Sequence, residues 1–537
     1  MDRSPYGYLG LEWIADIFLP AGFATVGQDF RGTQNSQGLF SIWHKDANDS
    51  EDLGNWIADQ SWSNGEIYTF GASADGLGAF TTVYNEPSWL KAQYFIWTSS
   101  IGYDVFYPQG TMVQELIDSW IHGTVDGEWA EVCYEDIKRN EMKTDWWDAV
   151  EMTGYYDRVH FPSAFWAGWY DIFLVGNLAA FRGYNEESDP KVRYTSKIMI
   201  DPLGHCQGAA SFFRPDLIAG RSLLAVMQAY EVYGVRPVAR TNVQNITFYV
   251  MSSNDTAGVE TANYWTSVET FPVPKMTPFY LHPDGTASQE KVSNDEETEG
   301  TSSTTYTYDP QNPVPTVGGS NLDMPCGPLD QSEIDQRADV LNFQTTPFEE
   351  AMYMTGPLFA HLYVGSDAID TDFMVRLSDV YPTGEVRLIQ DSAVRMRWRQ
   401  GTRLPVYMKA DEVYRVTASL WNTSYAIAPG HSVRVSVTSS NYPRFSANPN
   451  NGELLIQNST DSEWIVAQNT LYHSSRYPSH VELPLVSRAQ LPELHDIKGE
   501  LAKAYPQLDA DKFLADHPDL FTEIVDRKKQ AKASGRF

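Results

Sequence analysis

Glu66-Ile-Tyr-Thr-Phe-Gly-Ala-Ser-Ala-Asp-Gly-Leu-Gly-Ala-Phe80 starts as a β-rich segment, breaks at Gly71 and continues as a helix of small residues. Ser73 lies at the break. Because Gly71 and Gly76 lack a Cβ, the chain can turn tightly here, expose the hydroxyl and aim the first helical amides at the group that Ser73 attacks. The pattern predicts a nucleophile elbow, although a strand, turn and helix with a serine N-cap fits it equally well.

Length and composition narrow the class of protein. A chain of 537 residues is too long for one core, so two or three domains are expected. No stretch approaches the roughly 18 uninterrupted apolar residues of a membrane span. The formal charge of −31 disfavours nucleic acid and anionic lipid, which bind through Lys and Arg clusters. We expect a small-molecule partner, no nucleic acid and no membrane, and leave a homodimer open.

The cysteines and acidic motifs give no positive sign of a metal or a disulfide. Cys133, Cys206 and Cys326 are widely separated, odd in number and without a C-x-x-C pair, so neither a disulfide framework nor a zinc ribbon is indicated. This favours the cytoplasm. Asp367 and its neighbours in D-x-x-D-x-D could supply calcium ligands, but a structural turn is the favoured interpretation. We expect no metal and no cofactor.

The first half of the chain alternates strands and helices. Short apolar strands are expected at residues 23–30, 66–72, 93–98, 161–168 and 193–200, with helical patterns between them. Such alternation is typical of a mostly parallel sheet covered on both faces.

A helical, aromatic-rich segment interrupts this pattern between Tyr103 and Val159 and predicts a cap over the carboxyl edge of the sheet. Its four tryptophans are expected to form the cap's own core rather than a substrate box. They are Trp120, Trp129, Trp146 and Trp147.

The second half is β-rich. After about residue 279 short alternating strands recur to about 486, which indicates a sandwich or jelly roll, and a helical tail follows that we expect to be loosely docked or mobile. The expected organisation is an α/β core over 1–103 and 160–305, a helical cap over 104–159, a jelly roll over 306–486 and a helical tail over 487–537.

A serine nucleophile needs a histidine base and a carboxylate that orients the base. Asp171 follows an apolar strand, and His205 follows the next one. The order Ser73, Asp171, His205 is that of an α/β-hydrolase triad, with each residue at a strand end. The competing candidates are Asp157, Asp201 and His160.

Several motifs together resemble the CocE/NonD hydrolase family over about residues 3 to 486. The motifs are Gln28-Asp-Phe-Arg-Gly-Thr, Gly71-Ala-Ser-Ala-Asp-Gly, Ala167-Gly-Trp-Tyr-Asp-Ile-Phe, Asp201-Pro-Leu-Gly-His, Cys326-Gly-Pro-Leu-Asp-Gln, Asp367-Ala-Ile-Asp-Thr-Asp-Phe and Ser440-Asn-Tyr-Pro-Arg-Phe-Ser-Ala-Asn-Pro-Asn. The resemblance implies an α/β-hydrolase core, a helical cap and a C-terminal jelly roll like galactose-binding domains.

The resemblance also implies residue roles. Ser73 would be the nucleophile, Asp171 the orienting acid and His205 the base. The Ala74 amide and the Tyr6 hydroxyl would form the oxyanion hole. The substrate pocket is expected to include Trp169, Ile172 and Phe173.

Two departures from the family stand out. Ala74 replaces the usual tyrosine after the serine, which should leave catalysis intact because the contribution there is a backbone N–H. The family's first three strands, including the one that leads into Tyr6, are expected to be absent. The strands at about 24–30 and 66–72 would then leave unpaired backbone groups, so the chain should fold poorly or be a shortened version of a longer protein.

Three functions compete. An ester hydrolase is favoured, because the apolar run Ile172-Phe-Leu cannot compensate a buried ammonium ion. Amide or peptide cleavage, as an acylase or an X-Pro dipeptidyl-peptidase, is the second. An inactive, truncated hydrolase that keeps a jelly-roll binding module is the third.

Overall fold

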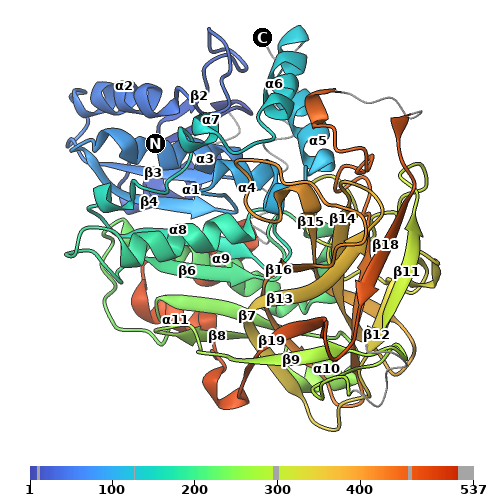
Figure 1. Ribbon diagram of the computed structural model, residues 1–537. Coiled ribbons are helices and arrows are strands. Elements are labelled where there is room, and N and C mark those ends of the chain that lie inside the picture. The colour runs from blue at the N-terminus through green and yellow to red at the C-terminus, as the bar shows by residue number, and fades with distance from the viewer. Residues whose placement is uncertain (9–11, 126, 294–301, 458–462, 518–537) are drawn as a thin grey trace.

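A parallel sheet forms the centre of the computed structural model, which describes residues 1–8, 12–125, 127–293, 302–457 and 463–517 (Figure 1). Its strands lie in the order β7, β6, β5, β4, β3, each parallel to the next. Their bounds are β3 Ile67–Ala72, β4 Leu90–Ile96, β5 Ser163–Gly168, β6 Lys197–Asp201 and β7 Ile246–Ser252. The carboxyl ends of β3, β5 and β6 therefore meet at one edge.

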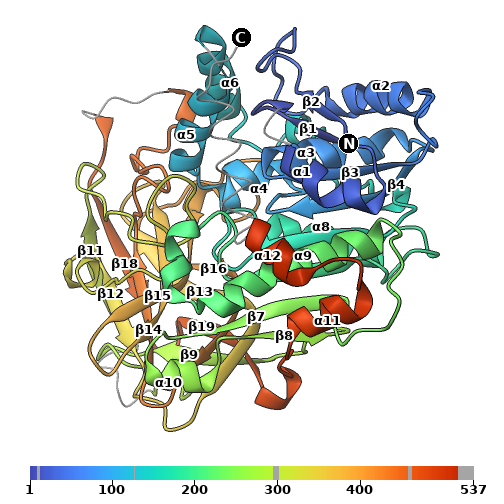
Figure 2. The same ribbon diagram turned by 180° about the vertical axis from the view of Figure 1, so that it is seen from behind.

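Helices cover both faces of this sheet. α8 (Leu174–Glu186) lies on one face in Figure 1, and α9 (Pro215–Val232) lies on the other in Figure 2. The Phe80 ring of α3 (Ala74–Thr81) stacks on Phe95 of β4, with ring centroids 3.8 Å apart. The α/β core expected from the sequence is confirmed. Among the helices of the described ranges, none combines the length and apolarity needed to cross a membrane.

Further short elements complete this part of the chain. They are α1 Glu12–Phe18, β2 Gly27–Asp29, α2 Asp46–Ala58, α10 Thr256–Thr261 and β8 Tyr264–Val268.

The strand that leads into Tyr6 is not wholly absent. β1 (Asp2–Ser4) pairs in parallel with β2. On its other side, the Met1 ammonium group donates to the Tyr68 carbonyl at 2.9 Å, and the Phe70 amide donates to the Met1 carbonyl at 3.0 Å. We expected the backbone groups between β2 and β3 to lack partners. This expectation is wrong where residues 1–4 lie, because they pair with β2 on one side and with β3 on the other.

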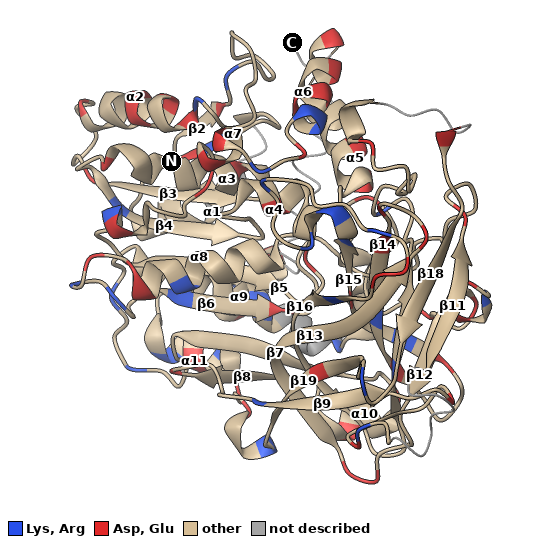
Figure 3. Cartoon of the chain, in the orientation of Figure 1, with Lys and Arg blue, Asp and Glu red and all other residues tan. Residues whose placement is uncertain are grey.

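The helical segment that we call the cap lies between β4 and β5. Its helices are α4 Gly102–Phe106, α5 Gln114–Thr124, α6 Glu128–Arg139 and α7 Asp145–Asp148. The first turn of α6 contains the acidic residues Glu128 and Glu131, and its last turn contains the basic residues Lys138 and Arg139 (Figure 3). Beyond α6, buried Glu141 accepts a hydrogen bond from Arg397 Nε at 3.0 Å, so an ion pair ties the cap to the β-rich part of the chain.

Two antiparallel sheets form the jelly roll. One contains β12, β17, β14 and β15, and the other contains β10, β9, β19, β13 and β16, with β18 paired to β13 and β11 paired to β18. The bounds are β9 Lys275–Leu281, β10 Ala287–Ser288, β11 Ser303–Tyr308, β12 Leu341–Gln344, β13 Met352–Ser366, β14 Asp372–Val380, β15 Val386–Arg395, β16 Tyr414–Ile427, β17 Ser432–Thr438, β18 Ala467–Tyr472 and β19 His480–Val486.

The jelly roll is continuous with the core. β16 pairs in parallel with β7 through Tyr425 and Ala426. β9 pairs with β19. The strands of the jelly roll therefore begin before residue 306, where the boundary was expected. The sequence could not show this, because it does not reveal which strand a given β segment will pair with.

The acidic motif near the start of β14 has a structural role. Asp370 Oδ2 lies 2.9 Å from Arg397 Nη1, and Asp372 Oδ2 lies 2.9 Å from Arg395 Nη2. All four side chains are buried. These carboxylates balance buried guanidinium charges, in agreement with the turn interpretation.

The described part of the C-terminal tail packs against the α/β core. α11 (Ile497–Ala504) and α12 (Ala510–Asp516) contact α9. Leu501, Ala504 and Tyr505 are at most 1% exposed, so the expectation of a loosely held appendage is wrong for residues 497–516. The expected helix beyond residue 517 lies outside the described residues.

Candidate active site

Ser73 occupies a sharp turn between β3 and α3. Its φ of 61° lies in a region that side-chain-bearing residues rarely adopt. A Cβ on Gly71 would lie 2.7 Å from the Gly76 Cα, and one on Gly76 would lie 2.6 Å from the Thr98 side chain. Both positions therefore need glycine so that the chain can pack closely. In addition, the Ser73 side chain makes no N-cap hydrogen bond. Both observations favour the nucleophile elbow over an ordinary N-cap.

Asp171 and His205 form a tight pair at the same edge of the sheet. The Asp171 Oδ2 atom lies 2.6 Å from His205 Nδ1 and accepts a second bond from the His205 amide at 2.7 Å. The other oxygen, Oδ1, accepts from the Phe173 amide at 2.8 Å. The carboxylate is therefore fixed and holds the imidazole with Nδ1 towards it, which leaves Nε2 for chemistry.

Asp201 shapes the loop that carries the histidine. Its Oδ1 atom accepts bonds from the Leu203 and Gly204 amides at 2.8 and 2.7 Å. Of the other two competing candidates, Asp157 is exposed, and His160 pairs with surface carboxylates. In the described part of the chain, neither is bonded to the Asp171–His205 pair.

Phe173 contacts both His205 and the cavity beside Ser73. The Phe173 ring lies 5.4 Å from the His205 ring and also lines the cavity that contains Ser73. Among the hydrogen bonds of the described residues there is none between Ser73 and His205. Such bonds are often long before substrate binds.

Tyr6 and Ala74, the two residues expected to form the oxyanion hole, both lie beside Ser73. The Tyr6 hydroxyl interacts with the Ser73 side chain and accepts a bond from Trp120 Nε1 at 2.9 Å. Burial, reinforced by the charge of Asp75, raises the pKa of Tyr6 well above its ordinary value, so the hydroxyl stays a donor. Ala74 begins α3, and its carbonyl accepts from Trp43 Nε1 at 3.0 Å.

The cavity beside Ser73 is small and mainly apolar. Ile172 and Phe173 line it, as expected, and three regions of the chain supply the rest. The lining residues are Trp43, Ser73, Ala74, Leu77, Val105, Phe106, Leu116, Trp120, Ile172, Phe173 and Leu322.

Trp169 does not line this cavity, contrary to expectation. Its indole Nε1 donates to the Tyr249 carbonyl of β7 at 2.8 Å, because the side chain points into the core. Trp120, expected in the cap core, instead stacks on Trp43 with ring centroids 5.2 Å apart and forms a wall of the cavity. Trp43 and Leu322 were missed, because nothing near them in the sequence signals a pocket.

A buried glutamate of the cap fixes the loop that supplies Leu322. Glu115 of α5 accepts bonds from the Leu322 amide at 3.1 Å and the Asp323 amide at 2.5 Å. Burial raises the pKa of Glu115. Cap and jelly roll thereby close over Ser73 together.

A second cavity of about 160 Å³ shares Val105, Ile172 and Phe173 with the first. Asp104 of α4 lines it. Burial raises the pKa of Asp104 to about 6, with Lys143 opposing the shift. The sequence argument found no carboxylate that could receive an amine, because it considered only the residues after Asp171. The cap supplies one.

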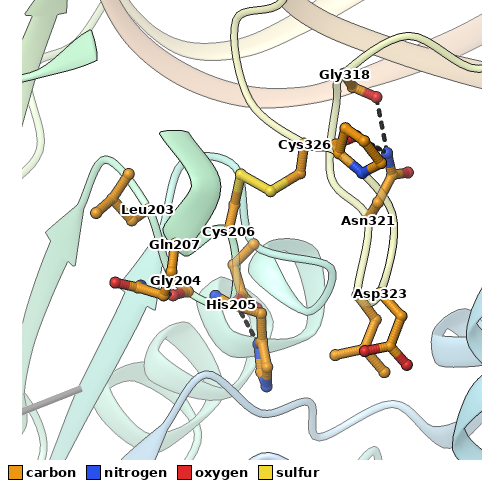
Figure 4. The surroundings of a disulfide bond; sticks show 12 residues. Leu203, Gly204, His205, Cys206, Gln207, Gly318, Asn321, Asp323 and Cys326 are labelled. Carbon is orange, nitrogen blue, oxygen red and sulfur yellow. Dashed lines mark hydrogen bonds and ion pairs between the residues drawn. A yellow bond between two sulfur atoms is a disulfide. The ribbon is translucent and has the colours of Figure 1, made fainter. Parts of the chain in front are cut away.

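A disulfide joins the histidine loop to the jelly roll. Cys206, next to His205, is bonded to Cys326, 120 residues away (Figure 4). The expectation of no disulfide is wrong, because a pairing across such a distance leaves no spacing pattern. Disulfides persist mainly in oxidising compartments, so the cysteine argument for the cytoplasm no longer holds.

Two family models match the chain. The X-Pro dipeptidyl-peptidase (S15 family) matches residues 1–130, and the X-Pro dipeptidyl-peptidase C-terminal non-catalytic domain matches residues 241–482. The second match includes β9, which supports the early start of the jelly roll.

Known proteins are similar along most of their length. The cocaine esterase of Rhodococcus sp. (strain MB1 Bresler) is 26% identical over 539 residues, which cover 89% of this chain and 90% of that protein. The structure of an α-amino acid ester hydrolase has a TM-score of 0.77 at 20% identity and covers 90% of this chain and 91% of its own. The structure of a CocE/NonD family hydrolase from Staphylococcus aureus has a TM-score of 0.61 at 16% identity. The match covers 85% of this chain and 79% of the Staphylococcus aureus chain.

Proposed function

Because the chain belongs to the CocE/NonD family of serine hydrolases, we propose that it cleaves carboxylic esters of small acyl groups through an acyl-enzyme formed on Ser73. The observation that carries the proposal is the pair of hydrogen bonds from His205 to Asp171 Oδ2, at the sheet edge that also bears Ser73.

The proposed reaction uses side chains of this chain, one backbone amide and water. His205 Nε2 takes the Ser73 proton as Oγ attacks the ester carbonyl, while Asp171 stabilises the imidazolium. The Ala74 amide and the Tyr6 hydroxyl donate to the oxyanion. The tetrahedral intermediate collapses, His205 returns the proton to the leaving alkoxide, and the alcohol departs. Water, deprotonated by His205, then attacks the acyl-enzyme and releases the acid and Ser73.

The cavity favours a small, uncharged acyl group. Its walls are aromatic and aliphatic, and an ammonium ion placed there would lose its hydration without compensation.

Cleavage of amides or of amino acid esters is the second candidate, and Asp104 is the observation that favours it. Its carboxylate lies in a cavity that shares a wall with the acyl cavity, where it could hold an amine.

Substrate panels separate the candidates. Full-length protein should hydrolyse p-nitrophenyl acetate and butyrate faster than Ala- or Gly-Pro-anilides, and Ser73→Ala and His205→Ala should each remove nearly all turnover, because triad members act as a unit. Preference for the anilides, together with their loss in Asp104→Asn while acetyl ester hydrolysis is unchanged, would establish the second candidate. No turnover of any substrate by the wild type would indicate an inactive hydrolase.

A further inference from the structure

Two histidines and a glutamate gather on the jelly roll, on strands that bear none of the proposed catalytic residues. His361 lies on β13, and His480 and Glu482 lie on β19. His361 and His480 are directly opposite each other in the antiparallel pair. His480 and Glu482 are two residues apart and share a face of β19, since side chains alternate along a strand. The pairing thus brings all three side chains together.

Their ligand atoms are close enough for one metal ion. One such atom from each of the three residues lies within 4.8 Å of the others. His361 Nε2 is 3.3 Å from Glu482 Oε2. A tetrahedral ion with bonds of about 2.0–2.1 Å sets its ligand atoms about 3.3 Å apart, so this pair already has the required separation. The His480 ring centroid lies 4.9 Å from that of His361, and a small side-chain rotation completes the set.

Hydrogen bonds to the opposite ring nitrogens orient both imidazoles. His480 Nδ1 donates to the Pro478 carbonyl at 2.8 Å, which places the proton on Nδ1 and leaves the Nε2 lone pair free. His361 Nδ1 lies 3.0 Å from the Thr417 hydroxyl. Metal-binding histidines are commonly held in this way, and such contacts fix the tautomer and the ring direction.

Burial and charge suit a cation that enters from solvent. The His361 side chain is 14% exposed and that of Glu482 31%. Arg415 opposes a cation electrostatically, but its side chain is exposed and therefore screened by water, whereas Glu482 contacts His361 directly.

We propose that His361, His480 and Glu482 bind a divalent transition metal ion of the zinc type, with water in the fourth position. Two imidazoles and a carboxylate are a donor set that suits zinc. The ion clips β19 to β13 and so holds the strand that precedes the docked tail (Figure 1). It is a stabilising site, separate from the ester chemistry.

Isothermal titration calorimetry tests the proposal. Full-length protein without a histidine tag, stripped with a chelator and dialysed, should bind one Zn²⁺ per chain at pH 7.5, and its melting temperature should rise on addition of zinc. Co²⁺ should give the visible absorption of a tetrahedral ion. His361→Gln and His480→Gln should each weaken Zn²⁺ binding by on the order of 10²-fold or more. Thr417→Val should weaken it by about 10-fold.

His160→Gln is the matched control, because His160 also pairs with carboxylates but belongs to no such three-residue group among the described residues. It should bind Zn²⁺ as the wild type does. No saturable binding by the wild type, or binding that both His361→Gln and His480→Gln retain, would overturn the proposal. Circular dichroism and esterase activity of the variants in the absence of metal report whether they are folded.

Discussion

At the scale of single residues, the site depends on two glycines that have no room for a side chain and on a serine with a positive φ. Gly71 and Gly76 touch across the elbow, and Ser73 keeps a positive φ between them. From the sequence alone, a nucleophile elbow and an ordinary N-capped helix fitted the glycine spacing equally well, and the positive φ of Ser73 together with the glycine contacts favours the elbow. The sequence also brought Asp171 and His205 together as candidates because both follow recognisable strands, and the structure shows these two residues hydrogen-bonded to each other.

Tyr6→Phe tests the oxyanion hole. The variant keeps the ring but loses the hydroxyl that interacts with Ser73 and Trp120. We expect kcat for p-nitrophenyl butyrate to fall on the order of 10²-fold with a smaller change in KM, because one donor to the developing charge is gone. An unchanged kcat would remove Tyr6 from the mechanism.

Asp104→Asn tests the buried carboxyl beside the acyl cavity. Burial raises the pKa of Asp104 from 3.8 to about 6, so the folded protein binds this proton more tightly than the unfolded chain. Ionisation therefore opposes folding as the pH rises through this interval. We expect Asp104→Asn to melt above the wild type at pH 8, and the difference should shrink or vanish at pH 4. A difference that does not depend on pH would contradict this assignment.

At the scale of elements, the helices α4 to α7 lie between β4 and β5, but their packing differs in part from the expectation. The aromatic helices were expected to pack on one another, and Trp147 does so. Trp120 of α5 instead faces Trp43 and Tyr6. The helical pattern shows which residues are apolar, but it cannot show whether an apolar face meets the cap or the core.

Glu115→Ala tests the clamp between cap and jelly roll. The substitution leaves the Leu322 and Asp323 amides without their carboxylate acceptor. We expect kcat/KM for butyryl esters to fall at least about 10-fold, and stability to fall by about 1–3 kcal/mol, the usual range for lost buried hydrogen bonds.

Asp118→Ala is the control for this prediction. It also removes an acidic side chain from α5, but Asp118 is only partly buried and accepts a bond from Gln114 of the same helix rather than from the jelly roll. Both kcat/KM and stability should stay near wild type in Asp118→Ala. Equal losses in the two variants would show that the effect comes from the helix and not from the clamp.

At the scale of the whole molecule, one cavity is assembled from three regions. Core, cap and jelly roll contribute Phe173, Trp120 and Leu322 respectively. The sequence predicted these regions but not their meeting point, because contacts between residues hundreds of positions apart leave no local pattern. The Cys206–Cys326 disulfide was missed for the same reason.

Replacing both Cys206 and Cys326 by serine tests this long-range link. We expect unfolding to become easier by about 2–4 kcal/mol, the typical contribution of a disulfide. Esterase activity should fall as well, because the bond anchors the loop that carries His205. Cys133→Ser, which changes a free cysteine of the cap, is the control for thiol loss. Wild-type stability and activity in the double variant would show that the loop needs no anchor.

The central claim is that Ser73 is the nucleophile of an acyl-enzyme. Its most direct test is peptide mass spectrometry after the protein is treated with a fluorophosphonate. The account predicts one adduct per chain, on the peptide that contains Ser73, no adduct in Ser73→Ala and much slower labelling in His205→Ala. An adduct on a different residue of an active preparation, with full turnover retained by Ser73→Ala, would contradict it.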